Sequence, residues 1–322
     1  MTLGPGALAD TLGALPVRVE AVQVQRRPVT VGDYPGARPS SVVRLSGRGQ
    51  VGRGENVAFS DEDQARFEAR APSLLSARST GDVWSGTVAS LLDGSARDYE
   101  RAALEAALID LALRQAERSL GALAGVSEAS VRVVLSFAAR PDAAAYARAL
   151  RAAGRREALK IDVDPAWTAA AVEALAVEPD VAVLDFKGRG DARLATMLSP
   201  RFPAALFEDP PPGTAHQHIA RDAPLGDAAA VGATLARGEA ANLKAPRMGG
   251  PLEVLRALEL ARRTTPAAVV YLGGMFEVDV GRTQARQLAA LFCPDGPNDL
   301  APLQEPAGAP RLTIRLDTPG FG

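Results

Sequence analysis

Short apolar runs alternate with helical segments over the second part of the chain. The runs are "VRVVLSF" (131–137), "EALKIDV" (157–163), "VAVLDF" (181–186), "PAALFED" (203–209), "AANLK" (240–244) and "AAVVYLGG" (267–274). Helix-start signals follow two of them: Asp164 and Pro165 open one segment, and Pro251 opens another. Alternation of this kind predicts parallel strands joined by crossover helices.

The number of these units favours a closed α/β barrel, with an open doubly wound sheet as the alternative. "HQHIARDAP" (216–224) is the only candidate for the fifth strand, and the segment before it is too short for a full helix. We therefore expect one crossover helix to be shortened or lost. "CPDGPNDLAP" (293–302) is interpreted as a loop after the barrel.

The first part of the chain has a different pattern. Its first 60 residues read as β-structure, with "VRVEAVQVQ" and "SSVVRLSGRG" as strands, and a helical block follows from about Asp61 to Gly125. "GRGQVG" (47–52) matches G-x-G-x-x-G, but it lies between two strands and predicts a tight hairpin. We expect an α+β domain over 1–128, a barrel over 129–302, and a tail, 303–322, that packs back on the first domain.

Composition narrows the class of protein. The 36 Lys and Arg residues nearly balance 38 Asp and Glu, which argues against a nucleic-acid or anionic-membrane surface. A single cysteine, Cys293, excludes an intramolecular disulfide and most thiolate metal sites. The first residues lack the features of a signal peptide, and no apolar run is long enough to span a membrane. We expect a cytoplasmic protein.

Charged residues stand at the end of each predicted strand from the second to the seventh. In order they are Lys160 and Asp162, Asp185 and Lys187, Glu208 and Asp209, Asp222, Lys244, and Glu277. A barrel gathers these ends at one mouth, where its chemistry lies. Asp185 and Lys187 are two apart, so on an extended strand they would point the same way.

Three of these acids, Asp185, Glu208 and Asp222, should converge on one side of the mouth. Converging carboxylates repel one another unless a cation lies between them, and hard oxygen ligands select Mg²⁺. The pattern thus predicts a magnesium site, with Lys244 facing it across a substrate.

The strand-end motifs "EALKID", "VLDFKG", "LFEDPPP", "RDAP", "NLKAPRMGG" and "YLGGMFEVDVGR" resemble those of the enolase superfamily, in its muconate-lactonizing and mandelate-racemase branch. The resemblance covers nearly the whole chain. It implies an α/β fold: a modified (β/α)7β TIM barrel with an N-terminal α+β capping domain.

The resemblance also implies an enzyme, a lyase or isomerase of a small carboxylate. A base removes the proton α to the carboxylate while Mg²⁺ stabilises the enediolate. By motif position, Asp185, Glu208 and Asp222 would be the metal ligands. Lys244 would be the acid/base on one face of the substrate, and Lys160 would assist a catalytic lysine on the other.

The sequence departs from this pattern at Asp162 and Lys187. Asp162 replaces the second lysine of the K-x-K motif, and Lys187 replaces an asparagine that usually follows the third-strand ligand. The two changes read as one exchange of an acid and a lysine between adjacent strands. Lys187 then supplies an ammonium near the metal, or acts as a base whose pKa the neighbouring Mg²⁺ lowers. Alternatively, Lys187 replaces the charge of the metal, and catalysis has diverged or been lost.

These departures shape the expected reaction. With one lysine left for proton transfer, elimination of water, as in an o-succinylbenzoate-synthase-like enzyme, or cycloisomerisation is favoured. A racemase or epimerase of an acyl-amino acid or dipeptide is one alternative. A diverged protein that only binds a small anion is another.

Four residues are candidates for substrate binding. Glu277 ends the seventh strand, Tyr34 and Arg38 belong to an early loop that resembles the family's specificity loop, and Asn298 lies near the end of the barrel. The expected partner is a small carboxylate. The oligomeric state stays open, with a homo-oligomer as one option.

Overall fold

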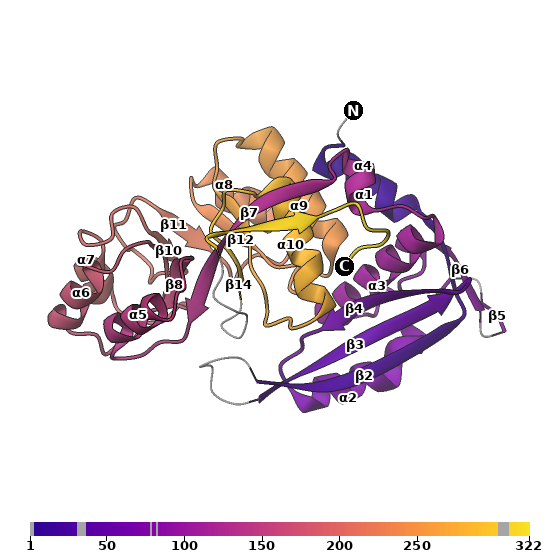
Figure 1. Ribbon diagram of the computed structural model, residues 1–322, viewed down its shortest axis with the longest axis horizontal. Helices are drawn as coiled ribbons and strands as arrows, with labels where there is room; N and C mark the ends of the chain where they lie inside the picture. The colour runs from indigo at the N-terminus through magenta and orange to yellow at the C-terminus, as the bar shows by residue number, and fades with distance from the viewer. Residues whose placement is uncertain (1–2, 31–36, 78, 82, 302–308) are drawn as a thin grey trace.

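The computed structural model describes residues 3–30, 37–77, 79–81, 83–301 and 309–322 (Figure 1). Two parts can be followed in it: a capping domain built from the first part of the chain and a barrel built from the second. None of the helices in these ranges has the length and apolarity that crossing a membrane requires.

The barrel consists of eight parallel strands. In the order of the sheet, from one end to the other, they are β13 (Val270–Leu272), β12 (Ala240–Leu243), β11 (Ile219–Arg221), β10 (Leu206–Glu208), β9 (Val181–Asp185), β8 (Ala158–Asp162), β7 (Glu128–Phe137) and β14 (Asn298–Ala301). A bridge between Gly273 and Asp299 joins the two end strands. The expected (β/α)7β barrel is therefore confirmed, and the open sheet is not.

Helices connect the strands on the outside of the barrel. They are α5 (Ala143–Ala152), α6 (Ala169–Ala176), α7 (Ala192–Leu198), α8 (Ala228–Ala236), α9 (Pro251–Thr264) and α10 (Val280–Phe292). Pro251 occupies the first turn of α9, as the sequence predicts. The start predicted at Asp164 is wrong, because Asp164 accepts the Ala166 N–H in a turn (2.9 Å) and Thr168 caps α6.

The crossover from β10 to β11 contains no helix, as expected from its length. In this crossover the ring of His216 is stacked on Phe207 of β10, with centroids 3.7 Å apart. Its Nε2 donates to the Ala205 carbonyl (2.8 Å), so its Nδ1 accepts from the Ser199 hydroxyl (2.9 Å). The stacked ring and these two hydrogen bonds thus hold the crossover against β10.

The capping domain carries two antiparallel sheets. One has the order β2 (Ala21–Thr30), β3 (Ala37–Gly47), β4 (Gln50–Asn56), and the other β1 (Pro16–Val19), β6 (Val83–Thr87), β5 (Ser79–Thr80). Its helices are α1 (Pro5–Ala14), α2 (Asp61–Arg70), α3 (Asp98–Gln115) and α4 (Leu120–Ala124), with 3-10 turns at Ala71–Leu74 and Val88–Ser90. The hairpin at 47–50 is confirmed.

Two expectations for this domain are wrong. Helix α1 lies in the stretch that reads as β, because the few apolar positions before Pro16 do not distinguish a helix from a strand. Strands β5 and β6 interrupt the block that reads as helical, since β6 pairs with β1, far away in the sequence.

Strand β4 lies directly on α3. A Cβ on Gly54 would lie 2.0 Å from the Ala103 carbonyl oxygen, and one on Gly52 would lie 2.3 Å from the Ala107 carbonyl oxygen. Glycine is therefore required at both positions for the helix to pack on the sheet. These glycines belong to the "GRGQVGRG" stretch, whose role is thus packing.

The end of the chain returns to the first domain. Strand β15 (Arg311–Arg315) pairs antiparallel with β7. The Phe321 N–H donates to Asp110 of α3 (2.7 Å), and the Phe321 carbonyl accepts from Gln284 of α10 (2.7 Å). The last residues therefore link a capping-domain helix to a barrel helix.

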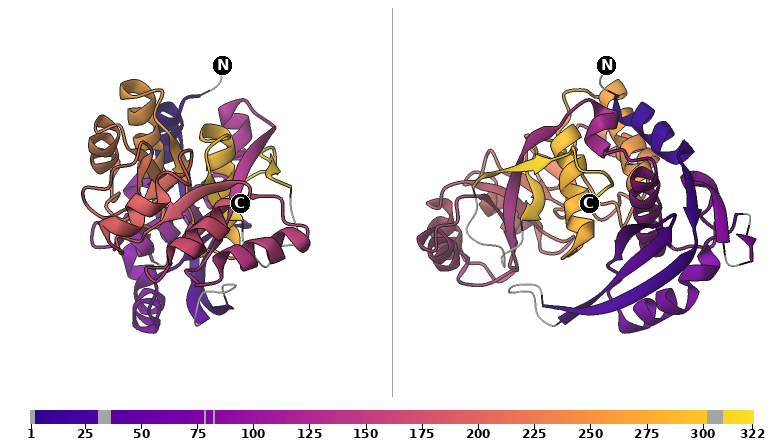
Figure 2. Two further views of the ribbon diagram at one scale, coloured as in Figure 1. Left: turned by 90° about the vertical axis from the view of Figure 1, so that its left-hand side faces the viewer. Right: turned by 45° about the vertical axis from the view of Figure 1, so that its right-hand side comes forward.

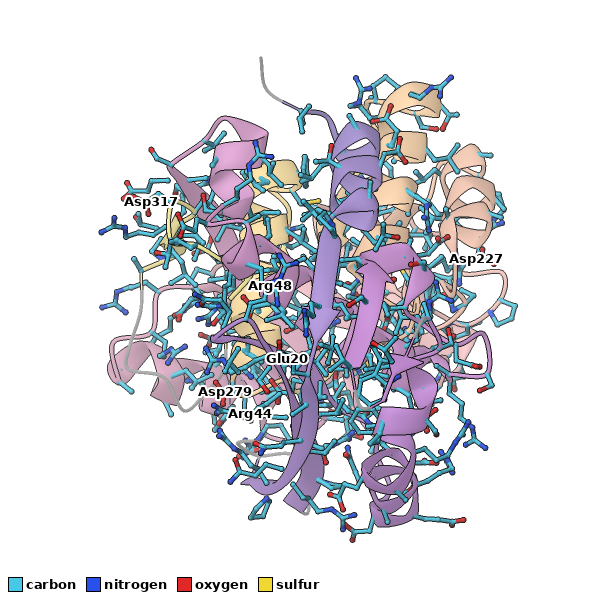
Figure 3. All side chains as sticks on the ribbon, turned by 90° about the vertical axis from the view of Figure 1, so that its right-hand side faces the viewer. Glu20, Arg44, Arg48, Asp227, Asp279 and Asp317 are labelled. Carbon is cyan, nitrogen blue, oxygen red and sulfur yellow. The ribbon has the colours of Figure 1, made fainter. Side chains whose placement is uncertain are left out.

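Two capping-domain carboxylates cap barrel helices. Glu55 accepts the backbone N–H groups of Asp279 (3.1 Å) and Gly281 (3.2 Å) at the start of α10. Glu105 accepts the Leu252 N–H (2.8 Å) at the start of α9. Figure 2 shows the capping domain along one side of the barrel, and Figure 3 labels Asp279, which pairs with Arg27 of β2 at 2.5 Å. The loops after β12 and β13 are thereby held against the capping domain.

Replacing Gly54 by Ala should lower the free energy of unfolding by about 1–3 kcal/mol, because the new methyl group overlaps the α3 backbone. Urea denaturation measures the change. Gly94→Ala is the matched control, since a Cβ there meets nothing within 4 Å. Equal stability of the two variants would show that β4 and α3 do not approach this closely.

Replacing Glu105 by Gln should remove a pH dependence of stability. Burial raises the pKa of Glu105 to about 7, although Leu252 N–H and Arg101 lower it. The folded state then holds a proton that the unfolded state has lost, so stability falls as pH rises from about 4.5 to 7, by about 3 kcal/mol in all. Denaturation midpoints across that range should decline for the parent relative to Glu105→Gln, and parallel curves would contradict the assignment.

Candidate active site

The strand register places three carboxylates side by side at the barrel mouth. Asp162 of β8 is the direct partner of Asp185 on β9, and Asp185 is the partner of Glu208 on β10. All three are buried. Like charges on adjacent strands destabilise a sheet, so this row requires cations close to it.

Lys160 supplies the first of them from inside the barrel. Its Nζ lies 2.5 Å from Glu208, 3.1 Å from Asp185 and 3.3 Å from Asp299 on β14. Burial lowers the pKa of Lys160, but attraction by Glu208, Asp185 and Asp299 outweighs burial and raises it well above its ordinary value. Lys160 is therefore a fixed ammonium that joins three strands.

Both carboxylate oxygens of Glu208 have hydrogen-bond partners. Lys160 contacts one oxygen, and the other accepts from the Tyr271 hydroxyl (2.5 Å) and from the Asn242 amide (3.1 Å). Both Glu208 and Tyr271 are fully buried. Burial raises the pKa of Glu208 to about 8, against the attraction of Lys160.

Lys187 supplies the second cation, but not in the way that strand alternation suggests. Strand β9 ends at Asp185, and Lys187 has a left-handed backbone with φ 54°. Its N–H donates to Asp185 (2.9 Å), while its ammonium turns back to contact Asp185 and to lie 3.2 Å from Asp162. The two residues meet because of a tight turn, which corrects the geometry expected for an extended strand.

The carboxylates around Lys187 set its charge state. Burial and the charge of Lys160 lower its pKa, but Asp185 and Asp162 outweigh them, and the pKa of Lys187 is raised. The pKa of Asp162 is itself raised, chiefly by burial. These two carboxylates favour the ammonium form of Lys187.

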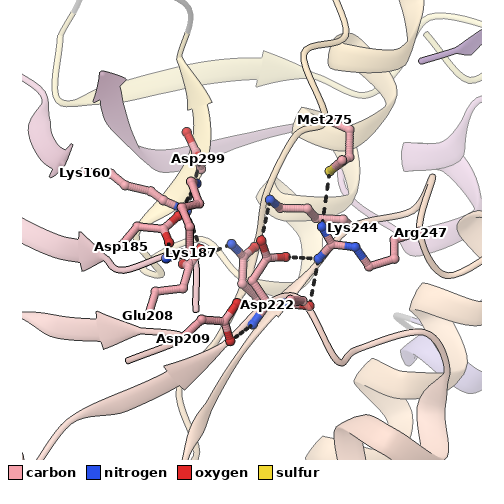
Figure 4. A network of polar contacts seen from close by, with 12 residues as sticks. Lys160, Asp185, Lys187, Glu208, Asp209, Asp222, Lys244, Arg247, Met275 and Asp299 are labelled. Atoms are coloured by element: carbon pink, nitrogen blue, oxygen red, sulfur yellow. Dashed lines mark hydrogen bonds and ion pairs between the residues drawn. The ribbon is translucent and has the colours of Figure 1, made fainter. Parts of the chain in front are cut away.

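The third group lies on the neighbouring strands (Figure 4). Lys244, after β12, donates to Asp222 (2.8 Å), and Arg247 donates to the other Asp222 oxygen and to its carbonyl (2.7 Å). Burial would raise the pKa of Asp222, but Lys244, Lys160 and Arg247 lower it. Asp209 accepts the Asp222 and Ala223 N–H groups (3.1 and 2.8 Å) and so fixes the end of β11.

These residues do not fit the magnesium site that the resemblance implies. Lys160 and Lys187 contact Asp185, Lys160 contacts Glu208, and Lys244 and Arg247 contact Asp222. Over the ranges that the structure describes, no three Asp, Glu, His or Cys side chains are arranged so that they could hold a metal ion. The positive charge at the mouth comes from side chains.

The four candidates for substrate binding differ in position. Arg38 lies over the rings of Phe59 (4.6 Å) and Phe276 (4.2 Å), which brings the capping domain to the loop after β13. Glu277 is buried in that loop and accepts the Met275 N–H (2.8 Å), and burial raises its pKa. Tyr34 falls outside the described residues.

Asn298 is part of the barrel wall. Its oxygen accepts the Leu272 N–H (2.8 Å), and its NH₂ group donates to the carbonyls of Cys293 (2.8 Å) and Arg132 (2.9 Å). Such a saturated amide has little left to offer a substrate. The next residue, Asp299, faces the site instead, because side chains alternate along β14, a strand and not the expected loop.

Sequence reasoning also missed Arg247, Tyr271 and Asn242, but one signal for the site is plain. The chain has only three lysines among its 36 basic residues: Lys160, Lys187 and Lys244. All three lie in this cluster. Lysine differs from arginine in being a compact charge that can lose its proton. A chain that uses arginine elsewhere keeps lysine where these properties matter.

Replacing Lys160 by Met should lower the free energy of unfolding by about 3–5 kcal/mol, because it leaves buried carboxylates without their cation. Chemical denaturation measures the loss. Arg201→Met is the control, since the Arg201–Glu173 pair is exposed and its removal should change little. If both variants lose the same small amount, Lys160 is not the centre of the cluster.

Solved structures with the same fold come from several bacteria. A mandelate racemase/muconate lactonizing enzyme from Roseiflexus sp. is 20% identical, with a TM-score of 0.74 over 100% of this chain and 98% of that one. A mandelate racemase/muconate lactonizing protein from Herpetosiphon aurantiacus is 20% identical (TM-score 0.75, covering 94% and 97%). A dipeptide epimerase from Enterococcus faecalis V583 is 19% identical (TM-score 0.73, covering 95% and 99%).

At this identity the likeness establishes the fold, and it confirms the resemblance to the enolase superfamily at that level. No curated protein matches the sequence. Two family models do: the N-terminal domain of "Domain of unknown function (DUF8230)" over residues 10–123, and its C-terminal domain over residues 127–304. Because the C-terminal match alone spans more than half of the chain, the protein belongs to the DUF8230 family, built on the enolase-superfamily fold.

Proposed function

We propose that this protein is an enzyme that acts on a small carboxylic acid at the barrel mouth. Lys244 transfers the proton α to the carboxylate, and elimination or cycloisomerisation follows. The observation that carries the proposal is the convergence of the three lysines at the carboxyl ends of the strands. The enzymes of similar structure, a dipeptide epimerase and muconate cycloisomerases among them, support the class of reaction.

Lys244 is the lysine best suited to proton transfer. It lies at the end of β12, mostly buried, and its contacts are to a single carboxylate, Asp222. Lys160, by contrast, is held by three carboxylates inside the barrel. A substrate carboxylate that competes with Asp222 would take the Arg247 guanidinium as its partner. Lys244, once it has given its ammonium proton to water, would then accept the α-proton.

The remaining cations would stabilise the product of proton removal. Taking a proton from the α-carbon leaves two negative charges on the substrate, which demands positive groups fixed in a water-poor site. Arg247 and Lys187 are the partly exposed cations of the cluster, at 23% and 38% side-chain exposure. Both are therefore open to a ligand at the mouth.

The position of Asp162 bears on the stereochemistry. Racemisation by two lysines requires one on each face of the substrate, and the resemblance places Asp162 where the second would lie. Reactions that use one lysine are therefore favoured. For an epimerisation, Asp162 would be the proton carrier on that face of the substrate, and burial raises its pKa.

Binding of a small anion without turnover is a second candidate. One observation favours it: Lys244 donates to Asp222, and Lys187 contacts Asp185 and Asp162, so each is already matched by a carboxylate. A small anion would then bind by replacing one of these carboxylates as the partner of a lysine.

Proton transfer can be tested with a panel of small acids that carry an α-proton: a 2-hydroxy acid, an N-acylamino acid and a dipeptide. Incubation in D₂O followed by NMR should show exchange of the α-proton for one of them, and Lys244→Arg should reduce the rate by a factor of about 10²–10⁴. Arginine keeps the charge opposite Asp222 but does not release its proton, so calorimetry should show that the variant still binds the acid.

Three outcomes separate the candidates. Exchange that needs Lys244 supports the enzyme. Binding without exchange in the parent supports the anion-binding protein. Exchange that survives in Lys244→Arg contradicts the assignment of Lys244.

A further inference from the structure

We propose that Lys187 is a built-in cation that takes the place of a divalent metal ion, so that the site handles its small carboxylate without Mg²⁺. The statement about the carboxylate rests on the proposed function, whereas the statement about the metal rests on the contacts of Lys187. Those contacts are an ion pair with Asp185 and a second with Asp162 at 3.2 Å.

The backbone fixes this ammonium in place. After β9 the chain turns through two left-handed residues, Lys187 and Gly188, with φ of 54° and 67°. The Gly188 N–H donates to the Asp209 carbonyl (3.0 Å), and the Arg189 N–H donates to the Phe186 carbonyl (2.8 Å). The turn is thus anchored to the end of the neighbouring strand, and Lys187 starts from a point beside Asp185.

The carboxylates that would bind a metal have their oxygens in use. One Asp185 oxygen accepts the Lys187 N–H (2.9 Å), and the other contacts both Lys187 and Lys160. Mg²⁺ requires near-octahedral oxygen ligands at short distance. Supplying them here would mean withdrawing two ammonium groups from Asp185 and leaving them near the ion.

The charges explain why Lys187 and Asp162 go together. Asp162 and Asp185 are partners across β8 and β9, so an ammonium placed between them neutralises two acids at once. With the first lysine, Lys160, behind the same row, the mouth has the positive charge that a divalent ion would bring. A metal ion added here would be repelled by the ammonium groups of Lys160 and Lys187, and it would not find an open site.

Calorimetric titration with Mg²⁺ tests the inference. The parent should bind no Mg²⁺ up to millimolar concentrations. Lys187→Asn removes the ammonium and leaves an amide that can coordinate or accept, and should gain millimolar or tighter binding. Lys187→Arg keeps the positive charge and should stay without metal, and thermal unfolding of both variants confirms that they fold.

Further variants and a chelator make the result decisive. Micromolar-to-millimolar binding by the parent, abolished by Asp185→Asn, would overturn the inference, as would a Lys187→Asn variant that gains none. α-Proton exchange by the parent that persists in EDTA supports it, and exchange that stops in EDTA and returns with Mg²⁺ contradicts it. If no acid of the panel exchanges under either condition, the proposed function fails, and the calorimetry still decides the metal.

Discussion

The arrangement of the barrel mouth depends on the buried ammonium of Lys160. Asp185, Glu208 and Asp299 come from three strands, and removing the cation between them would leave buried acids without their partner, which is strongly destabilising. Because Lys160 and Glu208 are fully buried, the pair is screened little by water. Lys187 lies on one side of this pair, and Asp222 with its partners Lys244 and Arg247 lies on the other.

The capping domain positions the rest of the site. Glu105 and Glu55 cap the helices that follow β12 and β13, and so hold the loops that carry Arg247 and Glu277. The first N–H groups of a helix have no partner within the helix, and these two side chains accept from them and so link the domains. A change in how the capping domain sits should therefore reach the mouth through these loops.

Much of the barrel was predictable because its strands are short apolar runs that end in charge. The order of Asp185, Glu208, Asp222 and Lys244 on successive strands follows from that pattern. The ion pairs between these lysines and acids could not be predicted from the pattern. Each pair depends on how far a side chain extends across the barrel and on the turn at Lys187. Strand β14 begins with two polar residues, and such a sequence is typical of a loop. A difference of one residue along this strand decides whether Asn298 or Asp299 faces the site, and it is Asp299 that does.

The central claim is that the positive charge at this mouth is built into the chain. NMR of protein labelled with ¹⁵N-lysine tests it directly, because the three lysines all lie in the site and each can be assigned by substitution. The account predicts a Lys187 ammonium signal that millimolar Mg²⁺ leaves in place and that Mn²⁺ does not broaden selectively. A Lys187 signal that moves with Mg²⁺, or is lost first with Mn²⁺, would contradict it.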